Sequence, residues 1–183
     1  MKEIVSEILR DNLRASEIIG RLRSFMKKVP LERKELDLND TVAETVKFLS
    51  PEARSRDIVL RSKLNGTALR IVGDPIQLQQ VFSNLILNGL DATSDTTQAE
   101  KAVAVATVRN GKFAEISVAD TGPGVSQDVA KKIFDPFFST KDHGMGMGLS
   151  IVRTIVETHD GHIAVDNRNG AKGAVFRVKL PLA

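Results

Sequence analysis

Helix and strand patterns alternate along most of this chain, and this alternation limits the folds it can adopt. Helices are expected over residues 41–53, 126–134 and 149–159, and another begins at Pro75 after the capping residue Asp74. Strands are expected over residues 57–64, 68–72, 101–109, 112–119, 162–167 and 174–180. Two strand pairs are linked by Asn65-Gly66 and Asn110-Gly111, which are typical hairpin turns. The pattern predicts an α+β fold, a two-layer α/β sandwich in which one mixed sheet carries helices on one face. Asn39 or Asp40 is expected to cap the helix over residues 41–53.

The first 30 residues have a different pattern. From Met1 to about Lys28, apolar side chains fall on one helical stripe that is three positions wide. This width suits a helix of a bundle better than a two-stranded coiled coil. Pro30 ends the helix, and the charged residues 31–35 are interpreted as a junction. We therefore expect two parts, residues 1–30 and residues 31–183.

Composition excludes several classes of protein. The chain has 183 residues, 42% of them hydrophobic, and no apolar run approaches the length of a membrane span. It has no cysteine, which excludes disulfides and thiolate metal sites and suits a reducing compartment. Its net charge of +3 is dispersed, and without Trp or Tyr it has no platform for stacking bases. We expect a cytoplasmic segment that binds no nucleic acid and has no membrane span, although a longer parent protein could carry an anchor.

Two glycine clusters lie between Asp120 and Ser150, and a lysine, Lys141, stands just before the second cluster. Glycine lets the backbone approach a ligand closely, and a row of N–H groups leading into a helix can hold a phosphate. One glycine motif is weak evidence, but here a carboxylate, Asp120, follows a strand pattern. A polar helix before it carries Asn84 and Asn88 one turn apart, so that their amides can meet a triphosphate and its Mg²⁺. Together these features predict a nucleotide site.

Structural explanations compete with this one. Two asparagines on a helix can simply face solvent, and Asp120 can merely cap the turn that follows it. Three aromatic residues between the clusters are interpreted as anchors for the base of a lid, namely Phe134, Phe137 and Phe138.

Four ordered motifs resemble the boxes of bacterial sensor histidine kinases. NLILNGLDA, which holds Asn84 and Asn88, resembles the N box, and DTGPGV resembles the G1 box. FDPFF resembles the F box, and after STK comes GMGMGLSI, which is similar to the G2 box. Residues 3–25 resemble the second helix of that family's dimerisation and histidine-phosphotransfer hairpin. The resemblance implies a Bergerat ATP-binding fold preceded by one long bundle-type helix.

The resemblance also implies roles for single residues. Asn88 would coordinate Mg²⁺, Asn84 would lie beside the phosphates, and Asp120 would accept a hydrogen bond from the adenine amine. Lys141 would neutralise charge on the γ-phosphate, and backbone N–H groups of the second glycine cluster would hold the phosphates. The catalytic residues expected are Asn84 and Lys141. The full ATP-binding set expected is Asn84, Asn88, Asp91, Asp120, Gly122, Gly124, Thr140, Lys141, Gly144, Gly146, Gly148 and Leu149.

Asn84 bears on the type of reaction. Related Bergerat ATPases, such as gyrase, place there a glutamate that acts as general base on water, whereas an asparagine takes no proton at neutral pH. The resemblance therefore implies phosphoryl transfer to a supplied nucleophile, with slow hydrolysis at most. None of the three histidines has the context of the family's phosphoacceptor, so we expect that histidine on another segment or chain.

The expected function is the ATP-binding catalytic module of a sensor histidine kinase in two-component signalling, with ATP and Mg²⁺ as cofactors. Its expected partners are the histidine-bearing hairpin and the receiver domain of a response regulator, and a homodimer through the N-terminal helix is left open. One alternative is a non-catalytic, nucleotide-gated interaction module. The other is a hydrolytic Bergerat-type ATPase, which Asn84 disfavours.

Three residues depart from the family's pattern. Gly89 replaces the usual alanine of the N box, which could loosen that helix by roughly 1 kcal/mol. Asp160 stands where Gly is common, and Ala174 stands where Thr is usual. Without the threonine hydroxyl, Asp120 lacks a group that could help it reach adenine through water, so nucleotide affinity could be reduced.

Overall fold

The computed structural model describes residues 32–94, 96, 100–140 and 146–183. Residues 33–183 form one compact unit. The predicted helix of residues 1–30 lies outside the described residues, as do two predicted site residues, Lys141 and Gly144. In the part of the chain that is described, no helix is both long and apolar enough to cross a membrane.

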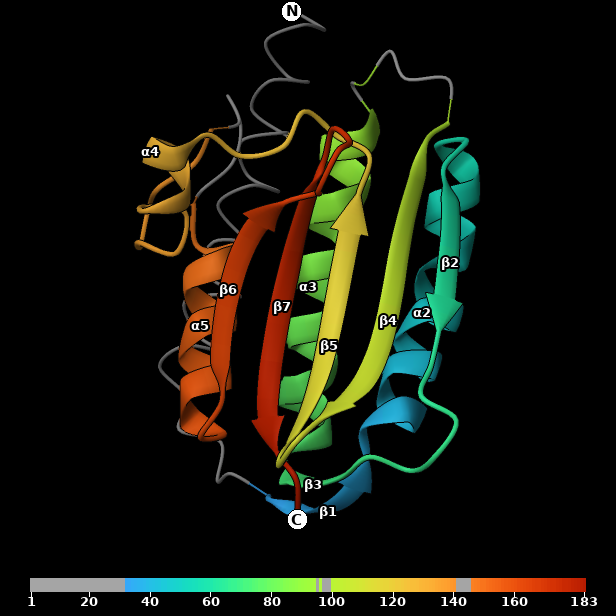
Figure 1. The fold of residues 1–183 in the computed structure, drawn as a ribbon, viewed down its shortest axis with the longest axis vertical. Coiled ribbons are helices and arrows are strands. Elements are labelled where there is room, and N and C mark those ends of the chain that lie inside the picture. The colour runs from blue at the N-terminus through green and yellow to red at the C-terminus, as the bar shows by residue number, and fades with distance from the viewer. Residues whose placement is uncertain (1–31, 95, 97–99, 141–145) are drawn as a thin grey trace, which may run out of the picture. The chain divides into compact units, whose positions relative to one another are not determined.

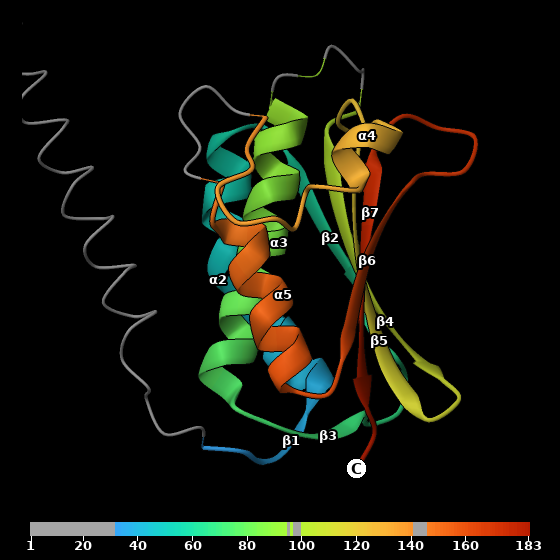
Figure 2. The ribbon, with the colours of Figure 1, turned by 90° about the vertical axis from the view of Figure 1, so that its left-hand side faces the viewer.

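A five-stranded mixed sheet forms one layer of the domain, and helices cover one of its faces (Figures 1 and 2). Across the sheet the strands are β2 (Val59–Lys63), β4 (Ala102–Asn110), β5 (Phe113–Asp120), β7 (Ala174–Pro181) and β6 (His162–Asn167). β2 and β4 are parallel, and the other neighbours are antiparallel. The helices on this face are α2 (Leu38–Ser55), α3 (Pro75–Ser94) and α5 (Gly148–Thr158). The predicted two-layer α/β sandwich is confirmed.

Helix α3 is the central element of the helical layer. It contacts α2 and α5 on its two sides and β4 and β5 beneath it. Its apolar side chains recur every three or four residues, and the fully buried ones are Leu78, Val81, Phe82, Leu85, Ile86 and Leu90. Burial of each such side chain contributes roughly 1.5–3 kcal/mol. The helix that carries Asn84 and Asn88 is therefore firmly anchored in the core.

The two hairpin predictions have different outcomes. β4 and β5 form the predicted hairpin, with Asn110 opposite Phe113 and Gly111 at a φ of +59°. The hairpin predicted across Asn65-Gly66 is wrong. β3 (Arg70–Gly73) does not pair with β2 but lies antiparallel to β1 (Lys34–Asp37) in a separate two-stranded sheet.

Contacts with distant residues explain why Asn65-Gly66 forms no hairpin. The Asn65 N–H donates to the hydroxyl of Thr107 on β4 at 2.8 Å. The amide of Asn39 at the start of α2 donates to the carbonyls of Asn65 and Thr67, at 3.2 and 3.0 Å. The loop is thus held open against the sheet and α2, and these contacts override the local turn signal.

The structure corrects three further boundaries. Residues 34 and 35 belong to β1 and not to a junction, because β3 supplies them with a partner strand. The α2 cap is Asp37, and not Asn39 or Asp40: its carboxylate accepts from the N–H groups of Asn39 and Leu69, both at 3.0 Å. Of the predicted helix 126–134, only α4 (Gln127–Ala130) is helical, and turns follow it.

Helix α5 ends in a Schellman motif with an aspartate at the position that glycine usually holds. The Asp160 N–H donates to the Glu157 carbonyl at 3.0 Å, the Gly161 N–H donates to the Val156 carbonyl at 2.9 Å, and Asp160 has a φ of +57°. Helix α2 ends in the same way, with Asp57 at a φ of +56°. The left-handed conformation disfavours a residue with a Cβ, so both aspartates are strained relative to glycine.

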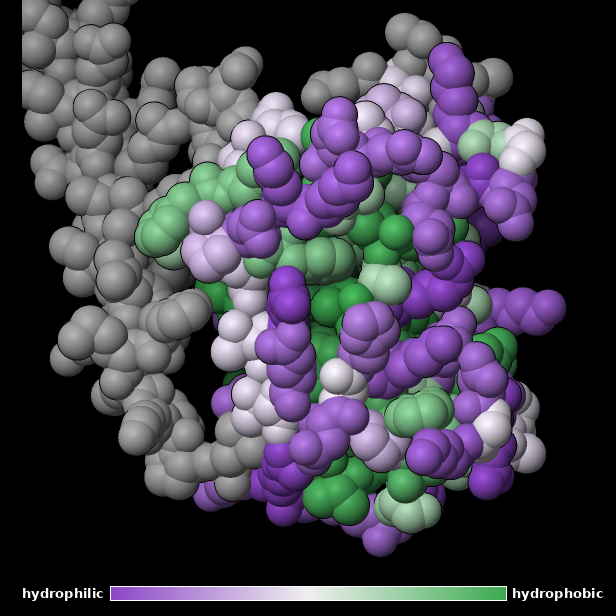
Figure 3. Space-filling model, turned by 60° about the vertical axis from the view of Figure 1, so that its left-hand side comes forward, coloured by the Kyte–Doolittle hydropathy of each residue, from purple (hydrophilic) through white to green (hydrophobic). Residues whose placement is uncertain are grey.

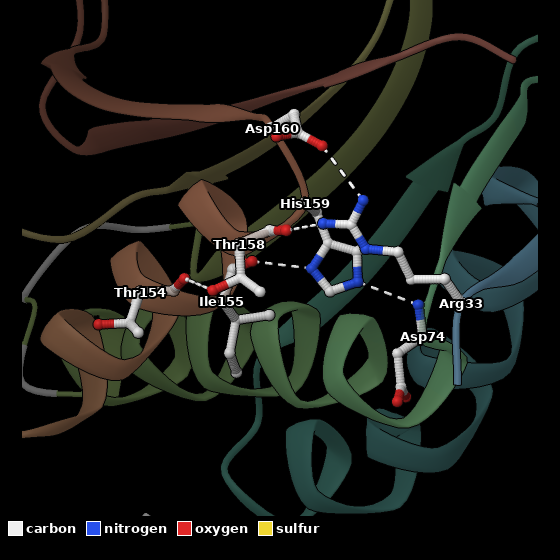
Figure 4. Close-up of polar contacts among 7 residues, drawn as sticks. All are labelled: Arg33, Asp74, Thr154, Ile155, Thr158, His159 and Asp160. Carbon is white, nitrogen blue, oxygen red and sulfur yellow. Dashed lines mark hydrogen bonds and ion pairs between the residues drawn. The ribbon is translucent and has the colours of Figure 1, made fainter. Parts of the chain in front are cut away.

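Side chains fasten this end of α5 to neighbouring segments (Figure 4). The ring of His159 is buried, and its Nε2 accepts from the Asp74 N–H at 3.0 Å while Nδ1 lies 2.8 Å from the Ile155 carbonyl. Because a backbone N–H can only donate, the Nδ1–H tautomer satisfies both contacts. Arg33 donates to the Thr158 carbonyl and forms an ion pair with Asp160 at 3.2 Å. His159 is therefore a structural link between α5 and the start of α3.

The two helix-ending aspartates allow a matched test of the Arg33 ion pair. We expect Asp57→Gly to raise the free energy of unfolding by about 1 kcal/mol, since glycine adopts positive φ without strain. Asp160→Gly should raise it less, because an exposed ion pair worth about 0.2–1 kcal/mol is lost. Urea unfolding of both variants measures the difference. Equal gains would show that the Arg33–Asp160 pair contributes nothing to stability.

Candidate nucleotide site

Asp120 ends β5 and is only 3% exposed. One of its carboxylate oxygens, Oδ1, accepts from the Gly122 N–H at 2.8 Å and from the Ala174 N–H at 3.1 Å. Among the described residues, the other oxygen, Oδ2, has no hydrogen-bond partner. Asp120 thus caps its turn with one oxygen and keeps the second available for a donor such as an exocyclic amine.

The surroundings of Asp120 change its acidity. Burial raises the pKa of the carboxyl above its ordinary value, because the charged form is poorly solvated there. The N–H donors of Ala174 and Gly122 and the nearby charge of Arg168 lower this pKa, but they do not outweigh burial. A donor that reaches Oδ2 would favour the charged form further.

Close backbone packing explains the glycines around Asp120. A Cβ on Gly122 would lie 2.7 Å from the Ala92 carbonyl oxygen of α3, and one on Gly173 would collide with the Asp120 carbonyl. Gly124 has a φ of +83°, which favours glycine. The structure therefore requires these glycines to bring the loop after β5 against α3 and against the start of β7.

Asn84 and Asn88 lie half-buried on α3, one turn apart as predicted. Within the described residues, the Asn84 amide makes no hydrogen bond. Gly89, next to Asn88, packs beside Asp120: a Cβ built there would lie 3.6 Å from the Asp120 Cβ. The structure thus packs the residue that follows the predicted Mg²⁺ ligand against the predicted adenine residue.

Asp91 has a structural contact that sequence reasoning missed. Its carboxylate forms an ion pair with Arg56 at 2.6 Å, and Arg56 also pairs with Glu52 at 2.6 Å. Both carboxylates raise the pKa of Arg56, chiefly through the hydrogen bond that Arg56 donates to Asp91. Asp91 therefore links α3 to the end of α2, and its predicted role in nucleotide binding stays a prediction.

The N-terminus of α5 is the candidate phosphate cradle. Its cap residue, Met147, supplies no side-chain hydrogen bond, and no described atom lies within 4 Å of a Cβ built on Gly148. The first N–H groups of a helix have no partner within the helix, and the helix dipole favours an anion beside them. Gly148 and Leu149 are half-buried and lie in this first turn, and their predicted contact with phosphate oxygens stays a prediction.

Comparison with known proteins decides the family. Residues 73–183 match the family described as histidine kinase-, DNA gyrase B-, and HSP90-like ATPase. The chain belongs to this family. It is an ATP-binding catalytic module of the kind found in sensor histidine kinases.

Relatives of this ATPase module are sensor proteins. The C4-dicarboxylate transport sensor protein DctS of Rhodobacter capsulatus is 40% identical over 92% of this chain and 26% of its own length. The sensor protein FixL of Bradyrhizobium diazoefficiens is 38% identical over 93% of this chain and 34% of its own length. The chain therefore spans about a quarter to a third of these relatives.

Solved structures of the histidine kinase ThkA have the same fold. Its isolated catalytic domain is 31% identical, with a TM-score of 0.73, over 82% of this chain and 96% of that domain. ThkA in complex with the response regulator protein TrrA is 28% identical, with a TM-score of 0.79, over 96% of this chain and 49% of ThkA.

The F-box segment of the module differs in part from expectation. The Phe134 ring packs edge-on against Phe176, with ring centroids 6.4 Å apart, and Phe138 is half-buried. These two residues fit the predicted anchoring role. Phe137 does not, because it is 78% exposed and has a φ of +66°. Figure 3 shows that apolar surface lies exposed between polar side chains on the side where α4, α5 and β6 come forward.

Gly146 and Thr140 flank residues 141–145, which lie outside the described part of the chain. Gly146 has a φ of +66°, and a Cβ on it would collide with the backbone of Phe137 and Phe138. This packing gives Gly146 a structural reason to be glycine besides the predicted phosphate contact. Thr140 is exposed. Its predicted contact with nucleotide stays a prediction.

Backbone groups make up much of what sequence reasoning missed at the site. The Ala174 N–H donates to Asp120, although the sequence indicated only a missing threonine hydroxyl at that position. The Thr121 hydroxyl accepts from the Ala102 N–H at 3.0 Å and so fastens the turn to β4. Asn167 accepts a hydrogen bond from the Val125 N–H. The only sequence signal for this contact was a polar residue at the end of a predicted strand.

Proposed function

We propose that this chain presents the γ-phosphate of Mg-ATP for transfer to a histidine, as the catalytic module of a sensor histidine kinase in two-component signalling. The observation that carries the proposal is the half-buried amide of Asn84 beside Asn88 on α3. An amide takes no proton from water, so this face can orient phosphates without activating a hydrolytic nucleophile. Transfer to a supplied histidine is the reaction that remains.

The residues of the site fit ATP. Oδ2 of Asp120 can accept from the adenine amine, and the N–H groups at the start of α5 can hold phosphate oxygens. Lys141, between the F box and α5 in sequence, would place a cation near the γ-phosphate.

The residues also fit Mg²⁺ that is bound together with the phosphates. Among the described residues, no group of three or more His, Cys, Asp or Glu is placed to hold a metal ion alone. Mg²⁺ commonly keeps several waters and takes one or two protein oxygens together with substrate phosphates. Asn88 can supply such an oxygen, and a bound Mg²⁺ would neutralise charge on the phosphates during transfer.

The proposal includes partners and a domain boundary. Residues 1–30 would be the second helix of the histidine-phosphotransfer hairpin, and residues 31–183 the catalytic module. The histidine would come from the rest of the hairpin, in the parent protein or in another chain. A response regulator would then receive the phosphoryl group, which the complex of the similar kinase ThkA with TrrA supports. The module would work in the cytoplasm.

Phosphoryl transfer to a separate hairpin tests the proposal. We expect labelled ATP and Mg²⁺, mixed with this chain and a hairpin that bears the phosphoacceptor histidine, to give an acid-labile phosphohistidine on the hairpin. Without the hairpin, phosphate release should stay far below one turnover per minute, because Asn84 is not a base. ATP binding without transfer would favour the non-catalytic module instead. Rapid steady-state phosphate release would favour the hydrolytic ATPase.

A further inference from the structure

Asn167, the last residue of β6, makes an unusual contact with the loop that follows Asp120. Its Oδ1 accepts from the Val125 N–H at 2.7 Å, and its Nδ2 donates to the Val125 carbonyl at 2.8 Å. Both polar atoms of one side chain thus pair with both polar atoms of one backbone residue. This is the pattern by which neighbouring strands hold each other.

The loop is shaped to accept this contact. A Cβ on Gly124 would lie 2.7 Å from Oδ1 of Asn167, so a larger residue there would push the amide away from Val125. Gly124 also has a φ of +83°. A glycine is therefore needed beside Asn167 for two independent reasons.

The same rung of the sheet holds both ends of the loop. Asn167 and Ala174 are cross-strand partners in the β6–β7 ladder. Ala174 donates its N–H to the Asp120 carboxylate at the beginning of the loop, and Asn167 binds Val125 at its end. Arg168 adds a longer hydrogen bond to the Asp120 carbonyl, at 3.3 Å.

We propose that Asn167 is a positioning residue of the nucleotide site and, by fixing Val125, keeps Oδ2 of Asp120 directed at the adenine amine. This inference rests on the proposed ATP site. A loop held in its binding conformation loses less conformational entropy when the ligand arrives, which raises affinity without a direct contact. Asn167 is exposed, so it stabilises the loop and not the hydrophobic core.

Titration of matched variants tests the role of Asn167. Asn167→Ala should weaken ATP binding about tenfold, the equivalent of one to two lost hydrogen bonds. Binding of purine riboside triphosphate, which lacks the 6-amino group, should weaken less than twofold, because Asp120 has no amine to accept from. Asn169→Ala is the control: Asn169 lies in the same hairpin turn, is exposed, and forms no hydrogen bond or ion pair with the described residues. It should leave both affinities and the thermal midpoint unchanged.

Other results would overturn the inference. Equal losses for ATP and for the analogue, with a lower thermal midpoint, would reduce Asn167 to a structural residue. If Asn167→Ala bound ATP with the same affinity as Asn169→Ala, Asn167 would have no role in the site. Failure of the proposed ATP site looks different, since the unmodified chain would then not bind ATP, or Asp120→Asn would bind it unchanged.

Discussion

Asp120→Asn is expected to weaken ATP binding by about 100-fold or more while the domain stays folded. The asparagine Oδ1 can still accept from the N–H groups of Gly122 and Ala174, which hold the present Oδ1. Its Nδ2 then replaces Oδ2, so that the amide NH2 donor of asparagine faces the NH2 donor of adenine where the carboxylate would accept a hydrogen bond. A buried donor left without an acceptor accounts for most of the loss. Calorimetric titration with ATP and Mg²⁺ measures it.

The raised pKa of Asp120 adds a pH dependence to this prediction. A carboxyl whose folded-state pKa is raised stabilises the fold most at low pH, and this contribution is lost as pH rises through the folded-state pKa. Asp120→Asn should therefore unfold at a temperature equal to or above that of the unmodified chain at neutral pH. ATP affinity of the unmodified chain should fall when acid protonates Asp120, whereas the weak affinity of the variant should not. A variant that binds ATP normally would remove Asp120 from the site.

Asn88→Ala is expected to abolish most of the Mg²⁺-dependent gain in ATP affinity and to reduce phosphoryl transfer by about 100-fold or more. Loss of the amide oxygen removes a ligand of the hard cation, whereas contacts with the adenine stay in place. Titration with ATP in EDTA and in Mg²⁺ separates the two contributions. Transfer to the added hairpin is measured with labelled ATP.

Gln80→Ala is the matched control for Asn88→Ala. Gln80 is an exposed amide residue on the same helix, two turns earlier than Asn88. It should leave affinity and transfer unchanged. If Asn88→Ala weakened ATP binding equally in EDTA and in Mg²⁺, the residue would not be a metal ligand.

Local signals predicted the main elements of the fold correctly. The buried stripe of α3, the Asp74-Pro75 start and the Asn110-Gly111 turn each depend on neighbours in sequence. The pairing of β1 with β3 was not predicted, because each strand has only four residues and is recognised only by its pairing with the other strand. The hairpin predicted at Asn65-Gly66 was wrong because Asn65 forms hydrogen bonds with Asn39 and Thr107, which are distant in the sequence.

In the candidate site, too, some features could be predicted from the sequence and others could not. Asp120 and Asn88 could be proposed from the sequence because their residue types suit the chemistry of a nucleotide site, and their contacts with nucleotide stay predictions. Backbone donors have no sequence signal, since every residue except proline has an N–H, and Ala174 was therefore noticed only for what it lacks. The ion pair of Asp91 with Arg56 had no local sequence signal, because the two residues lie 35 positions apart.

The position of β7 sets an order for synthesis and assembly. β7 is made after every other strand, yet it lies between β5 and β6, and its first residue supplies one of the two donors to Asp120. A nascent chain on the ribosome that has already completed the glycine-rich motifs therefore still lacks half of the support for the Asp120 carboxylate. We therefore expect the proposed contact of Asp120 with adenine to form only after β7 has emerged from the ribosome and inserted between β5 and β6.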